Sequence, residues 1–83
     1  MSYSISEAAK RTRTPGRRLL AWEQSLYLDP PLRRKGQRIV RAYSDADIAI
    51  ILRVKELLQQ GYTLRAAFRQ ARAELLLPER QSP

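Results

Sequence analysis

Two adjacent prolines, Pro30 and Pro31, limit the possible fold of this chain more than any other feature of its sequence. Proline fixes the backbone angle φ and has no N–H to donate, so neither a helix nor a central strand continues through such a pair. A helix that precedes the pair must end before it, and a new element must start after it. The chain therefore consists of short elements on both sides of this break.

The segment before the prolines opens with a helix start signal. Ser4 and Glu7 have the spacing of a capping box, in which the serine hydroxyl accepts from the amide of the third residue and the glutamate reaches back. Ile5, Ala8 and further small residues follow at helical spacing. These features predict a helix over residues 5–12.

A second short helix is expected over residues 16–25, with Thr14 as its N-cap and Pro15 as its first helical residue. Its apolar face, which we expect to lie in the core, consists of Leu19, Trp22 and Leu26. Two short helices joined by a tight turn make a helix-turn-helix.

Residues 32–43 follow the prolines and combine β-branched side chains, an aromatic end and one glycine, Gly36. This pattern predicts a short β-hairpin. Its tip, from Arg33 to Arg38, is the densest basic stretch of the chain. Cations held so close together repel one another unless a polyanion neutralises them. The alternative is a flexible charged loop.

Two longer helices complete the chain. Ser44 is the expected N-cap of a helix over residues 45–60 that ends at Gly61. Thr63 opens a fourth helix, which Pro78 ends. The apolar stripe of that helix is Leu64, Ala67, Phe68, Ala71 and Leu75. We expect one mainly α domain over residues 1–77, in the order helix, helix, hairpin, helix, helix, and a flexible tail over 78–83.

The net charge of +8 is unevenly distributed. Residues 1–43 hold ten basic and three acidic residues, a balance of +7, and the remainder has a balance of +1. Arginine supplies 13 of the 16 cations, and its planar guanidinium suits two-point contacts to phosphate and guanine. This asymmetry favours a polyanion-binding face, with a coding bias for arginine as the alternative.

The composition argues against several other classes. The chain has no Cys and no His, which removes thiol chemistry, disulfides, common zinc sites and histidine acid–base catalysis. Its acidic residues do not converge as a carboxylate pair, and it has no glycine-rich phosphate loop. No apolar run approaches the ~18 residues of a membrane span. We expect a cytoplasmic, nucleoid-associated protein that is not an enzyme, with no cofactor, metal, membrane or small-molecule site in this chain.

The chain resembles the DNA-binding domain of the MerR family of bacterial transcription regulators, a winged helix-turn-helix. The resemblance covers about residues 3–75 and rests on six segments in order: residues 3–12, Leu19, Trp22-Glu23, Leu28 with Pro30 or Pro31, residues 41–48 (RAYSDADI) and residues 60–64 (QGYTL). The Trp22-Glu23 pair and the Pro-Leu-Arg entry to the hairpin are most similar to the light- and cobalamin-responsive branch.

The resemblance implies that the second helix enters the major groove of DNA and that the hairpin is a wing on the flanking backbone or minor groove. It implies a phosphate contact for Arg41 and packing of Trp22 on the sugar-phosphate backbone. Trp22 has core burial as its alternative, and Glu23 either reads cytosine or forms an ion pair with an arginine. The expected DNA-binding residues are Arg13, Arg17, Arg18, Trp22, Arg33, Arg34, Lys35, Arg38, Arg41 and Tyr43.

Five residues depart from the family pattern. Arg13-Thr14 replaces the usual Gly-Val of the turn, and Leu26 replaces the glycine after the second helix. Arg18 and Leu20 replace the usual threonine and arginine, so one expected phosphate contact is in doubt.

The leading hypothesis is therefore sequence-specific binding of double-stranded DNA for transcription regulation, with a homodimer or assembly on DNA. The alternative is a protein-interaction adaptor, an antirepressor or a recombination directionality factor, with the same fold. RNA binding is a third and weaker option.

Overall fold

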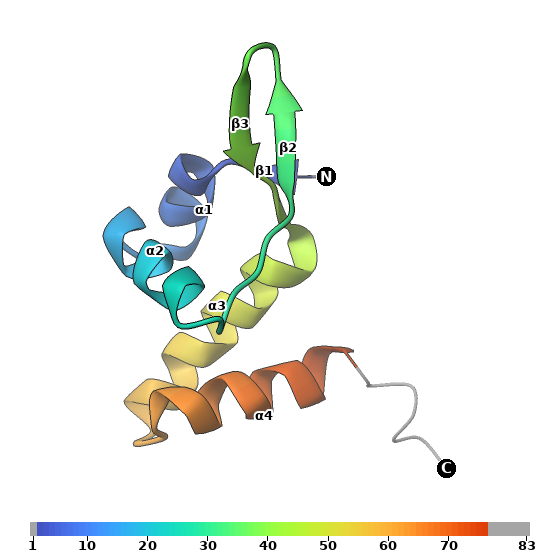
Figure 1. Ribbon diagram of the computed structural model, residues 1–83. Coiled ribbons are helices and arrows are strands. Elements are labelled where there is room, and N and C mark those ends of the chain that lie inside the picture. Colours follow the sequence, from blue (N-terminus) through green and yellow to red (C-terminus); the bar gives the residue numbers. More distant parts are fainter. Residues whose placement is uncertain (1, 77–83) are drawn as a thin grey trace. The chain divides into compact units, whose positions relative to one another are not determined.

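A computed structural model describes residues 2–76 and within them shows four helices and four short strands (Figure 1). In chain order they are β1 (Ser2–Tyr3), α1 (Ile5–Thr12), α2 (Gly16–Gln24), β2 (Leu32–Lys35), β3 (Arg38–Arg41), β4 (Tyr43–Ser44), α3 (Asp45–Gln59) and α4 (Leu64–Leu76). The order helix, helix, hairpin, helix, helix is confirmed, and the fold is a winged helix-turn-helix. The β1–β4 pair was not expected.

The chain divides into two compact units, Met1–Ile48 (unit 1) and Ala49–Pro83 (unit 2). Unit 1 contains α1, α2, all four strands and the first turn of α3. Unit 2 contains the rest of α3 and α4. The predicted tail over 78–83 and the role of Pro78 lie outside the described residues.

The capping box of α1 is present as predicted. The Ser4 hydroxyl accepts from the Glu7 amide at 3.2 Å, and a Glu7 carboxylate oxygen accepts from the Ser4 amide at 3.0 Å. The helix ends at Arg13, whose φ of +52° is left-handed, and the Thr14 amide then donates to the Ala9 carbonyl at 3.1 Å. This conformation closes the helix and turns the chain towards α2.

The prediction of Thr14 as the N-cap of α2 is wrong by one residue. Pro15 holds that position, and its carbonyl accepts from the amides of Arg18 and Leu19. Thr14 is buried, and its hydroxyl donates instead to the Thr12 carbonyl at 3.2 Å. Proline has no side-chain acceptor, so no side-chain hydrogen bond caps the amino end of α2.

The placement of Leu26 in the core is also wrong, because its side chain is 82% exposed. Leu26 lies just after α2 with a φ of +64°, and the Tyr27 amide beyond it donates to the Trp22 carbonyl at 2.9 Å. The backbone therefore reverses at Leu26, which turns the side chain off the apolar stripe that Leu19 and Trp22 occupy. Periodicity fails here because the helix ends at Gln24, two residues before Leu26.

We expect Leu26→Gly to stabilise the protein. A left-handed conformation costs an ordinary residue about 1–2 kcal/mol, and glycine escapes this cost while losing some entropy on folding. The expected net gain is about 0.5–1 kcal/mol in the free energy of unfolding, which thermal or urea unfolding measures. Ser25→Gly is the matched control, since Ser25 has an ordinary φ of −88° and should gain nothing. Equal or lower stability of Leu26→Gly would show that the conformation is not strained.

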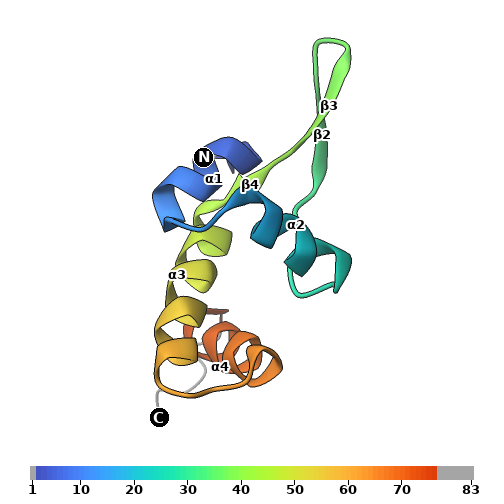
Figure 2. The ribbon, with the colours of Figure 1, turned by 90° about the vertical axis from the view of Figure 1, so that its left-hand side faces the viewer.

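Strands β2 and β3 form the predicted hairpin, which extends away from α1 and α2 (Figures 1 and 2). Leu32 pairs with Arg41 and Lys35 with Arg38, and Gly36 in the turn has a φ of +67°. Strands β1 and β4 pair at the base of unit 1, so residues from both ends of the unit lie side by side.

The described core of unit 1 is small and comes from α1, α2, β4 and the segments that connect them. Its fully buried side chains include Leu19 from α2 and Tyr43 from β4. The other buried residues of the unit are Ala8, Thr12, Thr14, Trp22, Leu28, Pro30 and Ala42. A second reciprocal cap lies at the start of α3. The Ser44 hydroxyl accepts from the Asp47 amide at 3.1 Å, and the Asp47 carboxylate accepts from the Ser44 amide at 2.9 Å.

Unit 2 is a helix pair with its own buried side chains. They are Ile50, Ile51, Val54 and Leu57 on α3 and Ala67, Phe68 and Ala71 on α4. The Thr63 hydroxyl accepts from the Ala66 amide at 3.2 Å, so the predicted start of the fourth helix is confirmed. Arg53 of α3 binds Glu74 of α4 through two nitrogens, the shorter contact being 2.7 Å. The stripe predicted for this helix is buried at its centre and more exposed at Leu75.

Candidate nucleic-acid interface

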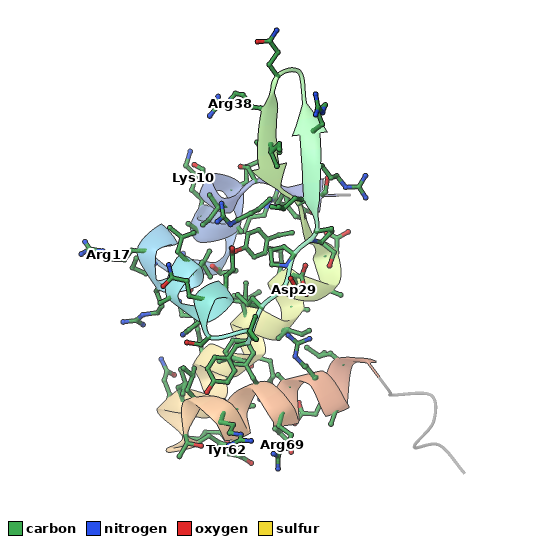
Figure 3. All side chains as sticks on the ribbon, viewed as in Figure 1. Lys10, Arg17, Asp29, Arg38, Tyr62 and Arg69 are labelled. Carbon is green, nitrogen blue, oxygen red and sulfur yellow. The ribbon has the colours of Figure 1, made fainter. Side chains whose placement is uncertain are left out.

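The first turn of α2 presents two arginines to solvent. Arg17 and Arg18 are both exposed, and Arg17 points away from unit 1 (Figure 3). The free amide hydrogens at the start of a helix carry partial positive charge, and no side chain caps them in α2. Cationic side chains and the positive helix end therefore coincide at one place, which suits an anionic ligand.

The hairpin carries a second group of exposed cations. Arg33 and Arg34 on β2 and Arg38 on β3 are exposed, whereas the side chain of Lys35 lies outside what the structure describes. Figure 3 shows Arg38 of the hairpin and Arg17 of α2 pointing towards the same side of unit 1. One cation of the helix and one of the wing therefore point to the same side of unit 1.

Lys10 was not among the expected interface residues, although its side chain lies near some of them. Its side chain is exposed on α1 and points to the same side as Arg17 and Arg38 (Figure 3). Its neighbour Arg11 behaves differently, since its guanidinium carbon lies 4.4 Å from the centre of the Tyr3 ring. Adjacent residues on a helix point in different directions, so Lys10 and Arg11 are separated. The sequence feature that could have identified Lys10 is its position on the polar face of α1.

Four acidic residues of unit 1 are used in structural contacts. Glu7 and Asp47 cap helices, and Asp45 accepts a hydrogen bond of 2.6 Å from the Tyr3 hydroxyl. Glu23 binds two partners described below. The fifth acid, Asp29, is exposed. Because most of these carboxylates are hydrogen-bonded at helix ends or to neighbouring side chains, exposed cations dominate the electrostatic potential around α2 and the hairpin.

Glu23 links α2 to the base of the hairpin. One of its carboxylate oxygens accepts from Nε of Arg41, and the other accepts from the Tyr43 hydroxyl. The Glu23 side chain is 13% exposed and that of Arg41 is 38% exposed. The hydrogen bond to Glu23 raises the pKa of Arg41. The ion-pair interpretation of Glu23 is confirmed, and one edge of the Arg41 guanidinium is occupied inside the protein.

The structure corrects the role expected for Tyr43, and it gives Trp22 the core burial that was one of its expected roles. Tyr43 is fully buried and Trp22 is 5% exposed, so both side chains are core residues of unit 1. A buried phenol cannot reach a duplex, and its hydroxyl is instead occupied by Glu23. The sequence could not separate these roles, because aromatic side chains have an apolar body and a polar tip that serve either purpose.

The environment of Tyr43 predicts alkaline destabilisation. Burial and the hydrogen bond to Glu23 raise the pKa of Tyr43 above its ordinary value. Above pH ~10 the phenol ionises in the unfolded chain and stays neutral in the folded one, so the free energy of unfolding falls as the pH rises. We expect Tyr43→Phe to remove up to about 1.4 kcal/mol per pH unit of that decline. Urea unfolding from pH 9 to 11 measures it, and identical slopes for both proteins would contradict it.

The arginines of α4 belong to unit 2 and form a separate group. Arg65 and Arg69 are exposed, and Figure 3 shows Arg69 pointing away from the helix. Arg72 is partly buried and takes part in contacts within the protein. Arg65 and Arg69 therefore form part of a solvated helix face.

Two other features are absent from residues 2–76. No group of three or more acidic, histidine or cysteine side chains that could hold a metal ion occurs among them. None of their helices has the length and apolar character needed to cross a membrane.

Comparison with known protein families gives one finding that covers most of the chain. Residues 3–74 match the family model described as MerR HTH family regulatory protein. A comparison with curated proteins gives no significant match. The match includes α1, α2, the hairpin, α3 and most of α4, and so covers all the surfaces described above.

Proposed function

Because the chain belongs to the MerR HTH family of regulatory proteins, we propose that unit 1 binds double-stranded DNA in a sequence-specific manner to regulate transcription. In this proposal α2 lies in the major groove and the hairpin contacts the flanking backbone or minor groove. The single observation that carries it is the shared orientation of exposed cations from α1, α2 and β3 (Figure 3).

The outer face of α2 supplies the base contacts in this proposal. Arg17, Ala21 and Gln24 are exposed and follow at helical spacing, so they form one stripe beside Leu20. Arginine pairs with guanine and glutamine with adenine in the major groove, and small apolar groups contact the thymine methyl. The stripe therefore has the chemistry to distinguish base pairs.

The hairpin supplies affinity in the same proposal. Arg33, Arg34 and Arg38 are exposed for phosphate contacts, which position a protein on DNA without reading its sequence. Arg41 contributes through its outer edge, because Glu23 occupies its Nε. Trp22 can add only the small part of its indole that is not buried.

Two copies on paired half-sites would bind more tightly than one, since a single small module buries a modest interface. We therefore propose a homodimer or assembly on DNA, in the bacterial cytoplasm and at the nucleoid. The adaptor alternative rests on the altered positions Arg18 and Leu20 of α2.

The proposal is tested by selecting bound sequences from a random pool of duplexes and then titrating salt. We expect an enriched motif, and a slope of log K against log salt of about −4 to −5 if about five phosphates are neutralised. Affinity that does not depend on salt would overturn the proposal. Absence of duplex binding together with a protein partner in a pull-down would favour the adaptor, and competition by duplex RNA would indicate RNA binding.

A further inference from the structure

The hairpin has one face that the proposed phosphate contacts do not explain. Leu32 and Ile39 are each 66% exposed, although both are large aliphatic side chains. They lie on different strands of a narrow ribbon whose other described side chains are mostly cationic. Single exposed apolar residues are ordinary, but two on one small element need a reason.

The strand register places the two residues on the same face. Leu32 pairs with Arg41 and Arg34 pairs with Ile39. Directly paired residues share a face, and residues two apart on one strand share it as well. This face therefore carries Leu32, Ile39 and two arginines, whereas Arg33, Arg38 and Val40 belong to the opposite face.

The contacts of Arg41 show which element of unit 1 this face of the hairpin is directed towards. Arg41 reaches Glu23 on α2, so the apolar pair lies on the face of the ribbon from which side chains reach the DNA-reading helix of the proposal. Ile39 also borders an open groove of about 610 Å³ between β3 and the start of α1. That groove is further lined by Ser4, Ser6, Arg38 and Arg41.

The positive charge around Leu32 and Ile39 indicates which kind of partner this face would contact. The apolar pair is surrounded by guanidinium groups on a protein of net charge +8, so contact with a second copy would bring like charges together. A DNA strand offers both phosphates for the arginines and the C–H surface of deoxyribose for the aliphatic side chains. A two-stranded ribbon is too wide to enter the ~6 Å minor groove as a whole, but aliphatic side chains on one of its faces can reach the sugars along the edges of that groove.

We propose that Leu32 and Ile39 form an apolar contact surface that packs against the sugars lining the minor groove next to the site read by α2, with Arg34 and Arg41 on the adjoining phosphates. This inference rests on the proposed function and deepens it, because it names the groove and the contact chemistry of the wing. Apolar side chains are known minor-groove elements in other architectures, where they widen or kink the duplex.

The test is the double variant Leu32→Thr,Ile39→Thr on the duplex obtained by selection. Threonine is a β-branched residue that suits a strand, and both positions are exposed, so we expect the fold to be retained. We expect about a tenfold loss of affinity with an unchanged salt slope, because apolar contacts release no counterions. The heat-capacity change of binding should also become less negative. Leu52→Gln is the control, since Leu52 is an exposed apolar residue of unit 2.

A minor-groove-binding polyamide identifies the groove. With the flanking minor groove filled, wild type and double variant should bind with equal affinity. A difference that persists, an unchanged affinity of the variant, or a loss accompanied by a smaller salt slope would overturn the inference. Loss of self-association in the variant would assign the face to a second copy instead. If wild type does not bind duplex DNA at all, the proposed function itself fails, which is a distinct outcome.

Discussion

Arg17→Ala,Arg18→Ala is expected to weaken binding to the selected duplex by about 2 kcal/mol or more, which is at least ~30-fold. Both side chains are exposed in the first turn of α2, where the uncapped helix end adds positive potential. Their removal takes away base or phosphate contacts together with two of the cations that attract the duplex. Fluorescence anisotropy with labelled duplex measures the effect.

Arg65→Ala,Arg69→Ala is the matched control for that variant. It removes the same charge from exposed positions on α4 in unit 2. A small loss in the control and a large loss in the α2 variant would locate the interface on α2. Equal losses would mean that only net charge matters, and the assignment of α2 as the reading helix would then be wrong. The single variant Arg18→Ala should in addition relax the sequence preference, which a repeated selection would detect.

Glu23→Ala is expected to destabilise the protein by about 2–3 kcal/mol and to lower its discrimination between DNA sequences. The substitution leaves the Tyr43 hydroxyl buried without the acceptor it now has, and such a loss costs about 1–3 kcal/mol. It also releases Arg41, so the base of the hairpin is no longer held to α2. Thermal unfolding measures the first effect, with a shift of about 4–8 °C for each kcal/mol.

The binding measurement separates positioning from simple loss of folding. The Glu23→Ala protein has one negative charge fewer, so below its unfolding midpoint we expect equal or tighter binding to random duplex and weaker binding to the selected one. Glu56→Ala is the control, because Glu56 is exposed and its 3.4 Å contact with Arg53 is a surface pair worth under ~1 kcal/mol. Parallel losses on both duplexes would contradict a positioning role for Glu23.

Much of this molecule follows from local rules that act over four residues or fewer. The Ser4 and Ser44 caps and the glycine in the hairpin turn each place an element boundary without help from distant residues. The concentration of cations before residue 44 likewise indicated the charged half of the chain. These predictions hold because caps, turns and charge counts depend on neighbours in sequence.

Tertiary structure decided the rest, because it depends on which groups meet across the chain. Only the folded structure shows that the buried Tyr43 and the side chain of Arg41 both donate hydrogen bonds to the Glu23 carboxylate. It also shows that Leu26 turns outward after α2. Strand register, which no single strand specifies, placed Leu32 and Ile39 on one exposed face. Composition therefore predicted a polyanion as the partner of this protein. Contacts distant in sequence decided which side chains are available to meet such a partner, because a buried side chain cannot reach a ligand however suitable its chemistry.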